Sequence, residues 1–128
     1  MTPEGLPPAS RGSHRRLDRL GIGLAGLCAL HCLLTLGLIS ALGLGGHFLF
    51  DENIHRIGLL LALIVAAVAI GTGLIRHGRM LPFAVALAGL ALMGAALVVP
   101  HGTNEFVLTL IGVGIVSVAH FLNIRAAR

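Results

Sequence analysis

The residues best suited to chemistry form one short motif, Cys28-Ala-Leu-His31-Cys32. In a helix, residues three and four positions apart lie on one face, so this spacing places the three side chains together. Thr35 extends the same stripe. Two sulfurs and one imidazole at that spacing can hold a single soft metal ion, because thiolate and imidazole ligands favour Cu(I), Zn(II) and similar ions.

The metals that suit this motif differ in the ligands they require. Hg(II) is soft and is satisfied by two thiolates in line, whereas Zn(II) takes four ligands, or three with water. A disulfide between Cys28 and Cys32 is not expected, because side chains four apart in a regular helix rarely meet its strict geometry. The alternative is that both cysteines are small apolar packing residues in a membrane helix. Against it stands the enclosed His31, since an ionisable group inside a membrane segment is costly and indicates a functional site.

A second histidine near the end of the chain could join this site. His120 lies about five residues before the final arginine pair, and Cys28 lies about nine residues after Arg19, so at ~1.5 Å per residue their depths differ by roughly 6 Å. We therefore predict His120 as a further metal ligand, with Asn123 on the same helix face. The alternative is that His120 hydrogen-bonds a neighbouring helix.

The remaining polar residues that could bind cations fall in two connecting segments. Exposed polar residues are normal in loops, so we favour ordinary solvated loops over a weak site that gathers cations. These residues are His47, Asp51, Glu52 and His55 in the first segment, and His101 and Glu105 in the second.

The elements that position these residues are predicted to be four transmembrane helices. Only 11% of the 128 residues are charged, against about 25% in soluble domains. Four stretches lack Asp, Glu, Lys and Arg: Leu20–Leu44, Ile57–Ile75, Leu81–Val99 and Phe106–Ile124. Each is long enough to cross a hydrocarbon core of about 30 Å, and in lipid each must be helical to satisfy its backbone. Short connections predict an all-α bundle running up-down-up-down.

Charge distribution predicts the orientation of that bundle. Eight of the nine arginines fall on one side of the up-down arrangement, and Arg56 alone falls on the other. Basic residues stay inside, so both termini are expected in the cytoplasm. Residues 1–19 form a polar, loosely ordered N-terminal segment, and residues 20–128 form the membrane domain. Clustered between apolar runs, the arginines indicate membrane orientation rather than nucleic-acid binding, and the lipid bilayer is the expected environment.

The chain resembles the MerC family of mercury-resistance membrane proteins. The segments that carry the resemblance are LCALHCLLTLGL in the first span, Glu52-Asn-Ile-His55, the His77-Gly loop and the closing Ala119-His120-Phe-Leu-Asn123-Ile-Arg125. The resemblance implies four spans, a cysteine pair in the first, and movement of Hg(II) from the periplasmic side to the cytoplasm across a bacterial inner membrane. Two features differ from the mercury transporters of that family. The cysteines here are spaced C-x-x-x-C where those proteins resemble C-x-x-C, and the second cysteine pair that they carry near the C-terminus is absent from this sequence.

Together these observations predict a heavy-metal transporter with a bound or transported ion and no other cofactor. The metal ligands are Cys28, Cys32, His31 and His120, and the ion implied by the resemblance is Hg(II). Zinc or another soft divalent ion stays open as the cargo, as does a metal-binding accessory or sensor protein without transport. A purely structural membrane protein is the third alternative. Because one copy offers little room for a gated path, we expect a homo-oligomer. An enzyme is not expected, because the sequence contains no recognisable set of nucleophile, base and orienting residue.

Overall fold

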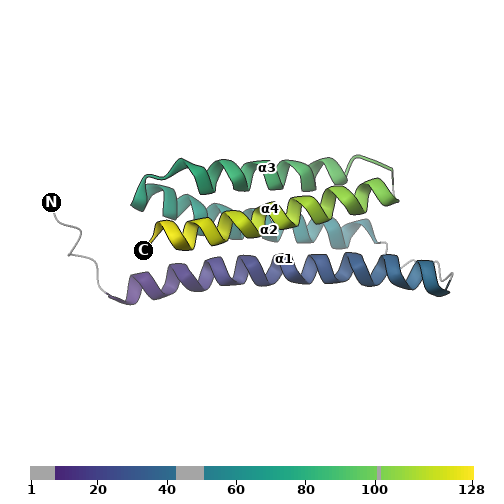
Figure 1. Cartoon of the computed structure of the whole chain (residues 1–128), viewed down its shortest axis with the longest axis horizontal. Coiled ribbons are helices and arrows are strands. Elements are labelled where there is room, and N and C mark those ends of the chain that lie inside the picture. Colours follow the sequence, from purple (N-terminus) through teal and green to yellow (C-terminus); the bar gives the residue numbers. More distant parts are fainter. Residues whose placement is uncertain (1–7, 43–50, 101) are drawn as a thin grey trace.

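The fold is a bundle of four antiparallel helices, seen in a computed structural model that describes residues 8–42, 51–100 and 102–128. The helices are α1 (Pro8–Leu42), α2 (Glu52–His77), α3 (Met80–Ala96) and α4 (Thr103–Ala126), and the described residues contain no strand. The start of α1, the end of α2 and the end of α4 lie at one end of the bundle (Figure 1). The prediction of an all-helical, up-down-up-down bundle is therefore confirmed.

Three of the helices are long and apolar enough to cross a membrane. The spans are Gly12–Leu38, Asn53–His77 and Thr103–Ala126, judged by length and composition. The remaining helix, α3, has 17 residues and is shorter than the other three. At ~1.5 Å per residue it covers roughly 25 Å, which is the lower end of the length needed to span a hydrocarbon core.

Helix α1 begins well before the predicted span. Residues 8–19 are helical, so the prediction of a loosely ordered segment over residues 1–19 is wrong for this part, and residues 1–7 lie outside the described residues. A proline at the first helical position starts the helix without losing a needed hydrogen bond. Further along, the Asp18 side chain is buried against α4 and holds this extension on the bundle.

Helix α2 also begins earlier than its apolar run. Asp51 caps the helix, since its carboxylate accepts a hydrogen bond from the Asn53 backbone N–H at 2.9 Å. The helix therefore includes Arg56 and also His55, which is predicted from the sequence to lie in a connecting segment. At its other end Gly78 adopts φ 66°, and its N–H closes the last turn on the Leu74 carbonyl.

The bundle interior is built from small side chains. Seven of the buried hydrophobic residues are alanines and no leucine is among them in the described part of the chain, whereas many leucines are exposed on the outer faces. Helices in lipid associate through close packing of small residues, while large apolar side chains face the acyl chains. Gly89 of α3 and Gly112 of α4 mark a close approach of two helix backbones, because a Cβ on either would collide with the opposite backbone.

Candidate metal centre

The first and second helices bring three potential ligands together. His31 and Cys32 of α1 meet His55 of α2, and one ligand atom from each lies within 4.8 Å of the other two. The Cys32 Sγ lies 3.7 Å from the His55 Nε2, and the rings of His31 and His55 are 5.8 Å apart between centroids. A shift of about an ångström would bring such atoms to the ~2.0–2.3 Å distances of metal bonds around one central ion.

A buried carboxylate lies behind one of these ligands. Glu105 of α4, only 5% exposed, approaches the His55 Nδ1 with its Oε1 at 3.9 Å. Metal-binding histidines commonly donate the second ring N–H to a carboxylate, which fixes the ring and raises its basicity. The solvated-loop interpretation is therefore wrong for His55 and Glu105, which the helix starts carry into the bundle. His47, His101 and the side chain of Glu52 lie outside the described residues.

His31 is the member of this cluster whose hydrogen-bonding capacity is not fully used. Its Nε2 is buried, and within the described residues it has no hydrogen-bond partner. A buried polar atom without a partner costs about 1–3 kcal/mol, so native proteins usually satisfy such atoms. An ion bound between His31, Cys32 and His55 would supply the missing partner.

Cys28 faces the same small space without belonging to the tight cluster. A cavity of about 30 Å³ is lined by the four side chains Cys28, His31, Cys32 and His55, with Met93 and Thr109 among its other walls. Cys28 is half-buried, and the sulfur packs next to Gly58 of α2. Both cysteines are free thiols. Thr35, also on this face, donates its hydroxyl to the His31 carbonyl at 2.8 Å and serves the helix backbone.

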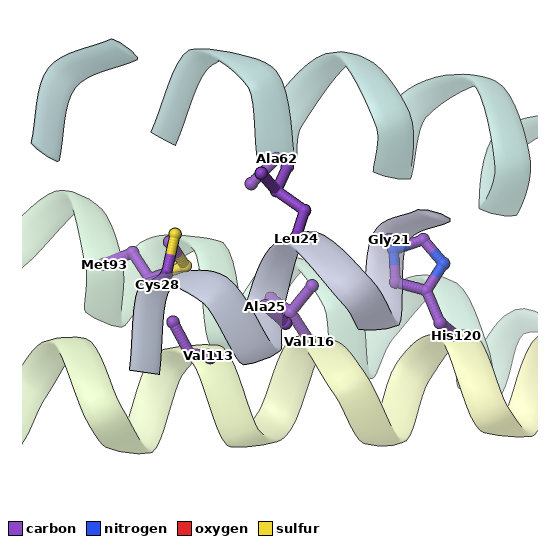
Figure 2. A pocket seen from close by; sticks show the side chains of 9 residues that line it. All are labelled: Gly21, Leu24, Ala25, Cys28, Ala62, Met93, Val113, Val116 and His120. Carbon is purple, nitrogen blue, oxygen red and sulfur yellow. The ribbon is translucent and has the colours of Figure 1, made fainter. Parts of the chain in front are cut away.

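His120 lies apart from this cluster. Its Nδ1 is 2.8 Å from Asp18 Oδ1, and its ring seats against Gly21, where a Cβ would collide with it. Gly21 and Cys28 are two helical turns apart, about 10 Å along the axis, so His120 cannot share a single ion with the outer ligands. The hydrogen bond to a neighbouring helix, predicted as the alternative, is present. The two residues do face one cavity, with Cys28 and His120 towards its opposite ends (Figure 2).

Asp18 is the buried functional group that the sequence analysis missed. It accepts hydrogen bonds from Asn123 Nδ2 at 3.2 and 3.0 Å in addition to its contact with His120. Because Asp18 lies among arginines in the sequence, its surroundings are typical of a solvent-exposed segment. The signal that identifies it is spacing: extending the cysteine stripe backwards in steps of three and four residues leads from Cys28 through Ala25 and Gly21 to Asp18.

Comparison with known proteins assigns the family. The family model for the MerC mercury resistance protein matches residues 18–125. The chain belongs to the MerC family. The matched range contains every residue of the metal cluster and of the Asp18–His120 pair. No match was found among curated proteins or among solved structures.

Membership of the MerC family and the apolar helices agree on the class of protein. The chain is a multi-pass membrane protein of a mercury-resistance family, with a metal-related transport function. The description of the family names mercury resistance and no catalysed reaction.

Proposed function

We propose that this chain carries mercuric ion across a bacterial inner membrane through a site formed by Cys28, Cys32 and the adjacent histidines. The observation that carries the proposal is the meeting of His31, Cys32 and His55, with ligand atoms within 4.8 Å, around a cavity that Cys28 also lines. Two thiolates satisfy the linear coordination of Hg(II), and the histidines are available as entering or leaving ligands.

The position of the cluster supports entry from the outer side. His55 lies in the first turn of α2 and Glu105 in the first turn of α4, at the end of the bundle opposite most arginines. If the arginine-rich end faces the cytoplasm, as the positive-inside rule requires, this cluster is close to the periplasm. An ion arriving from outside would meet it after passing only the first turns of the helices.

The chemistry of the site explains how such an ion can enter lipid. A bare divalent cation in a low-dielectric interior carries a prohibitive solvation penalty. An ion that exchanges one protein ligand for the next stays coordinated throughout. Because thiols bind metals as thiolates, each capture releases protons, and metal loading is coupled to proton release.

Zinc is the second candidate cargo, and the histidines favour it. His31, Cys32 and His55 with Cys28 form a set of two nitrogens and two sulfurs, which matches the ligand types of tetrahedral zinc sites. The approach of Glu105 to His55 resembles the carboxylate–histidine pairs that support zinc. The two cargoes differ in which side chains they need: Hg(II) requires both sulfurs, whereas Zn(II) requires the histidines as well.

The test is uptake of radioactive Hg(II) and Zn(II) into proteoliposomes holding the full chain. We expect Hg(II) uptake by the wild type and its loss in both Cys28→Ser and Cys32→Ser. Ser117→Ala is the matched control, because the Ser117 hydroxyl donates to the Val113 carbonyl of its own helix and Ser117 is not among the residues that line the cavity. Binding without uptake in the wild type would instead assign an accessory or sensor role. Normal uptake by both cysteine variants would refute the transport proposal.

A further inference from the structure

The wall of the metal cavity contains a third sulfur, that of Met93 in α3. Met93 is 7% exposed and lines the cavity of about 30 Å³ together with Cys28, Cys32 and the two histidines. A thioether is a neutral, soft donor that favours ions such as Cu(I). It is the soft donor of this cavity that the assignments of Hg(II) and Zn(II) leave unused.

Met93 lies next to Cys28. Of the residues that line the metal cavity, these two also line the apolar cavity that extends towards His120. Cys28 packs against the buried cluster to which Met93 belongs. Figure 2 shows the two side chains together at the end of the apolar cavity opposite His120. Helices α1 and α3 thus bring a thiol and a thioether to one position in the bundle.

The close approach of α3 and α4 holds the Met93 side chain inside the bundle. A Cβ on Gly112 would come within 2.7 Å of the Met93 Cγ, so the absence of a side chain at Gly112 leaves room for the stem of the methionine. Ala62 and Val113 are apolar walls of the cavity that Met93 shares with Cys28. The sulfur of Met93 is therefore confined to the interior and kept out of the lipid.

The metal cavity has two chemically different sides. On one side the Cys32 Sγ lies 3.7 Å from the His55 Nε2, with the Glu105 carboxylate 3.9 Å from the other ring nitrogen. That side offers nitrogen and additional negative charge, which suit a divalent ion. The side of Cys28 and Met93 offers two sulfurs among apolar walls.

Charge balance decides which ion suits the sulfur side. An ion in apolar surroundings is least costly when its ligands neutralise its charge. One thiolate and one thioether together carry a single negative charge. They neutralise a monovalent cation, whereas a divalent cation would keep an uncompensated charge.

We propose that Cys28 and Met93 form a site for a soft monovalent cation of the Cu(I) class. Cys28 supplies the thiolate and Met93 the thioether. His31 lines the same cavity, and its buried Nε2, which has no hydrogen-bond partner among the described residues, can supply a third donor. The inference rests on the proposed metal-binding function of this cavity and extends it to a second class of ion. A methionine that only filled space would be replaceable by leucine, which has a similar volume.

The test is calorimetric titration of the purified full chain with Ag(I), which has the charge and softness of Cu(I). Met93→Leu should lower the Ag(I) affinity at least ~10-fold, because losing even a supporting group of a metal site costs ~10–100-fold. Its Hg(II) affinity should be unchanged, since two thiolates complete that coordination, and retained Hg(II) binding also shows that the variant is folded. Met80→Leu is the matched control, because Met80 is 63% exposed at the first residue of α3, and it should bind both metals normally.

The two cysteines should respond differently to the two metals. Cys28→Ser removes the thiolate next to Met93 and should lower the Ag(I) affinity much more than Cys32→Ser does. Hg(II) binding should be lost in either variant, because it needs both sulfurs. Equal loss of Ag(I) affinity in the two cysteine variants would contradict the pairing of Cys28 with Met93.

Selenomethionine tests the contact without replacing Met93 by another residue. In Met80→Leu the labelled positions are Met1 and Met93. After loading with Ag(I), X-ray absorption at the selenium edge should show a silver neighbour. Absence of that neighbour would overturn the site. This measurement decides the question if Met93→Leu loses both metals through misfolding.

The outcomes separate this inference from the transport proposal. Equal Ag(I) affinity in the wild type and Met93→Leu would overturn the Met93 site, whatever the uptake of Hg(II). A silver neighbour at selenium in a chain that takes up no Hg(II) would refute the transport proposal alone.

Discussion

Removing the Asp18 carboxylate should destabilise the bundle far more than removing the Asp51 carboxylate, which makes a hydrogen bond at the start of α2. Asp18 is 3% exposed and accepts from His120 at 2.8 Å and from Asn123 at 3.2 and 3.0 Å. In Asp18→Ala the Asn123 amide keeps its bond to the Ala69 carbonyl, but the buried His120 Nδ1 loses its hydrogen bond to the carboxylate. Breaking a buried, hydrogen-bonded pair on one side costs ~3–5 kcal/mol.

Asp51→Ala provides the matched comparison. Asp51 is exposed and its side chain makes one capping hydrogen bond, to the Asn53 N–H. Loss of such a cap costs ~0.5–2 kcal/mol. The free energy of unfolding should therefore fall by at least about 1 kcal/mol more in Asp18→Ala than in Asp51→Ala.

The assay can use the protein's own thiols. The chain contains no Trp or Tyr, but Cys32 is 1% exposed, so a fluorogenic thiol reagent reports loss of tertiary structure while circular dichroism follows the helices. With metal-free protein in detergent micelles, Asp18→Ala should lower the midpoint of thermal labelling by on the order of 10 °C. Equal midpoints for the Asp18 and Asp51 variants would refute the conclusion that the Asp18 network holds α1 on the bundle.

Three further predictions concern other parts of the molecule. Gly112→Val should destabilise the protein by ~1–3 kcal/mol or more, because its Cβ would meet backbone and side-chain atoms of α3. Gly114→Val is the control: its Cβ would meet nothing within 4 Å, so it should be nearly neutral in the same unfolding assay. His55→Ala should weaken Zn(II) binding at least ~10-fold by calorimetry but leave two-thiolate Hg(II) binding largely intact, and equal losses for both metals would contradict the ligand assignment. A reporter fused after Arg128 should be active only as a cytoplasmic reporter, and periplasmic activity would overturn the orientation.

The sequence was informative wherever a property repeats along one helix. Charge-free stretches predicted four helices, and the spacing of Cys28, His31 and Cys32 placed them on a common face that does turn into the bundle. The helix ends were less accurate, because apolar runs mark the lipid-facing length and not the capped start, which is how His55 was assigned to a loop.

Residues that meet across helices were the part that periodicity could not supply. The pairing of Cys32 with His55, the approach of Glu105 to His55, and the contact between Asp18 and His120 all depend on how helices rotate and slide against one another. Comparing only the depths of the two residues in the membrane predicts that His120 could meet Cys28. The His120 ring instead packs against Gly21, which lies about two turns before Cys28 in α1.

The central claim is that one soft ion is held by both sulfurs of α1, and X-ray absorption spectroscopy of the purified protein loaded with one equivalent of Hg(II) tests it most directly. Two sulfur neighbours per mercury are expected in the wild type, because Cys28 and Cys32 line the same cavity. His31→Ala should preserve both, and Cys28→Ser or Cys32→Ser should leave one sulfur and weak binding. A wild-type spectrum without two sulfur neighbours, or unchanged affinity in both single cysteine variants, would show that these cysteines are packing residues and that the metal site lies elsewhere.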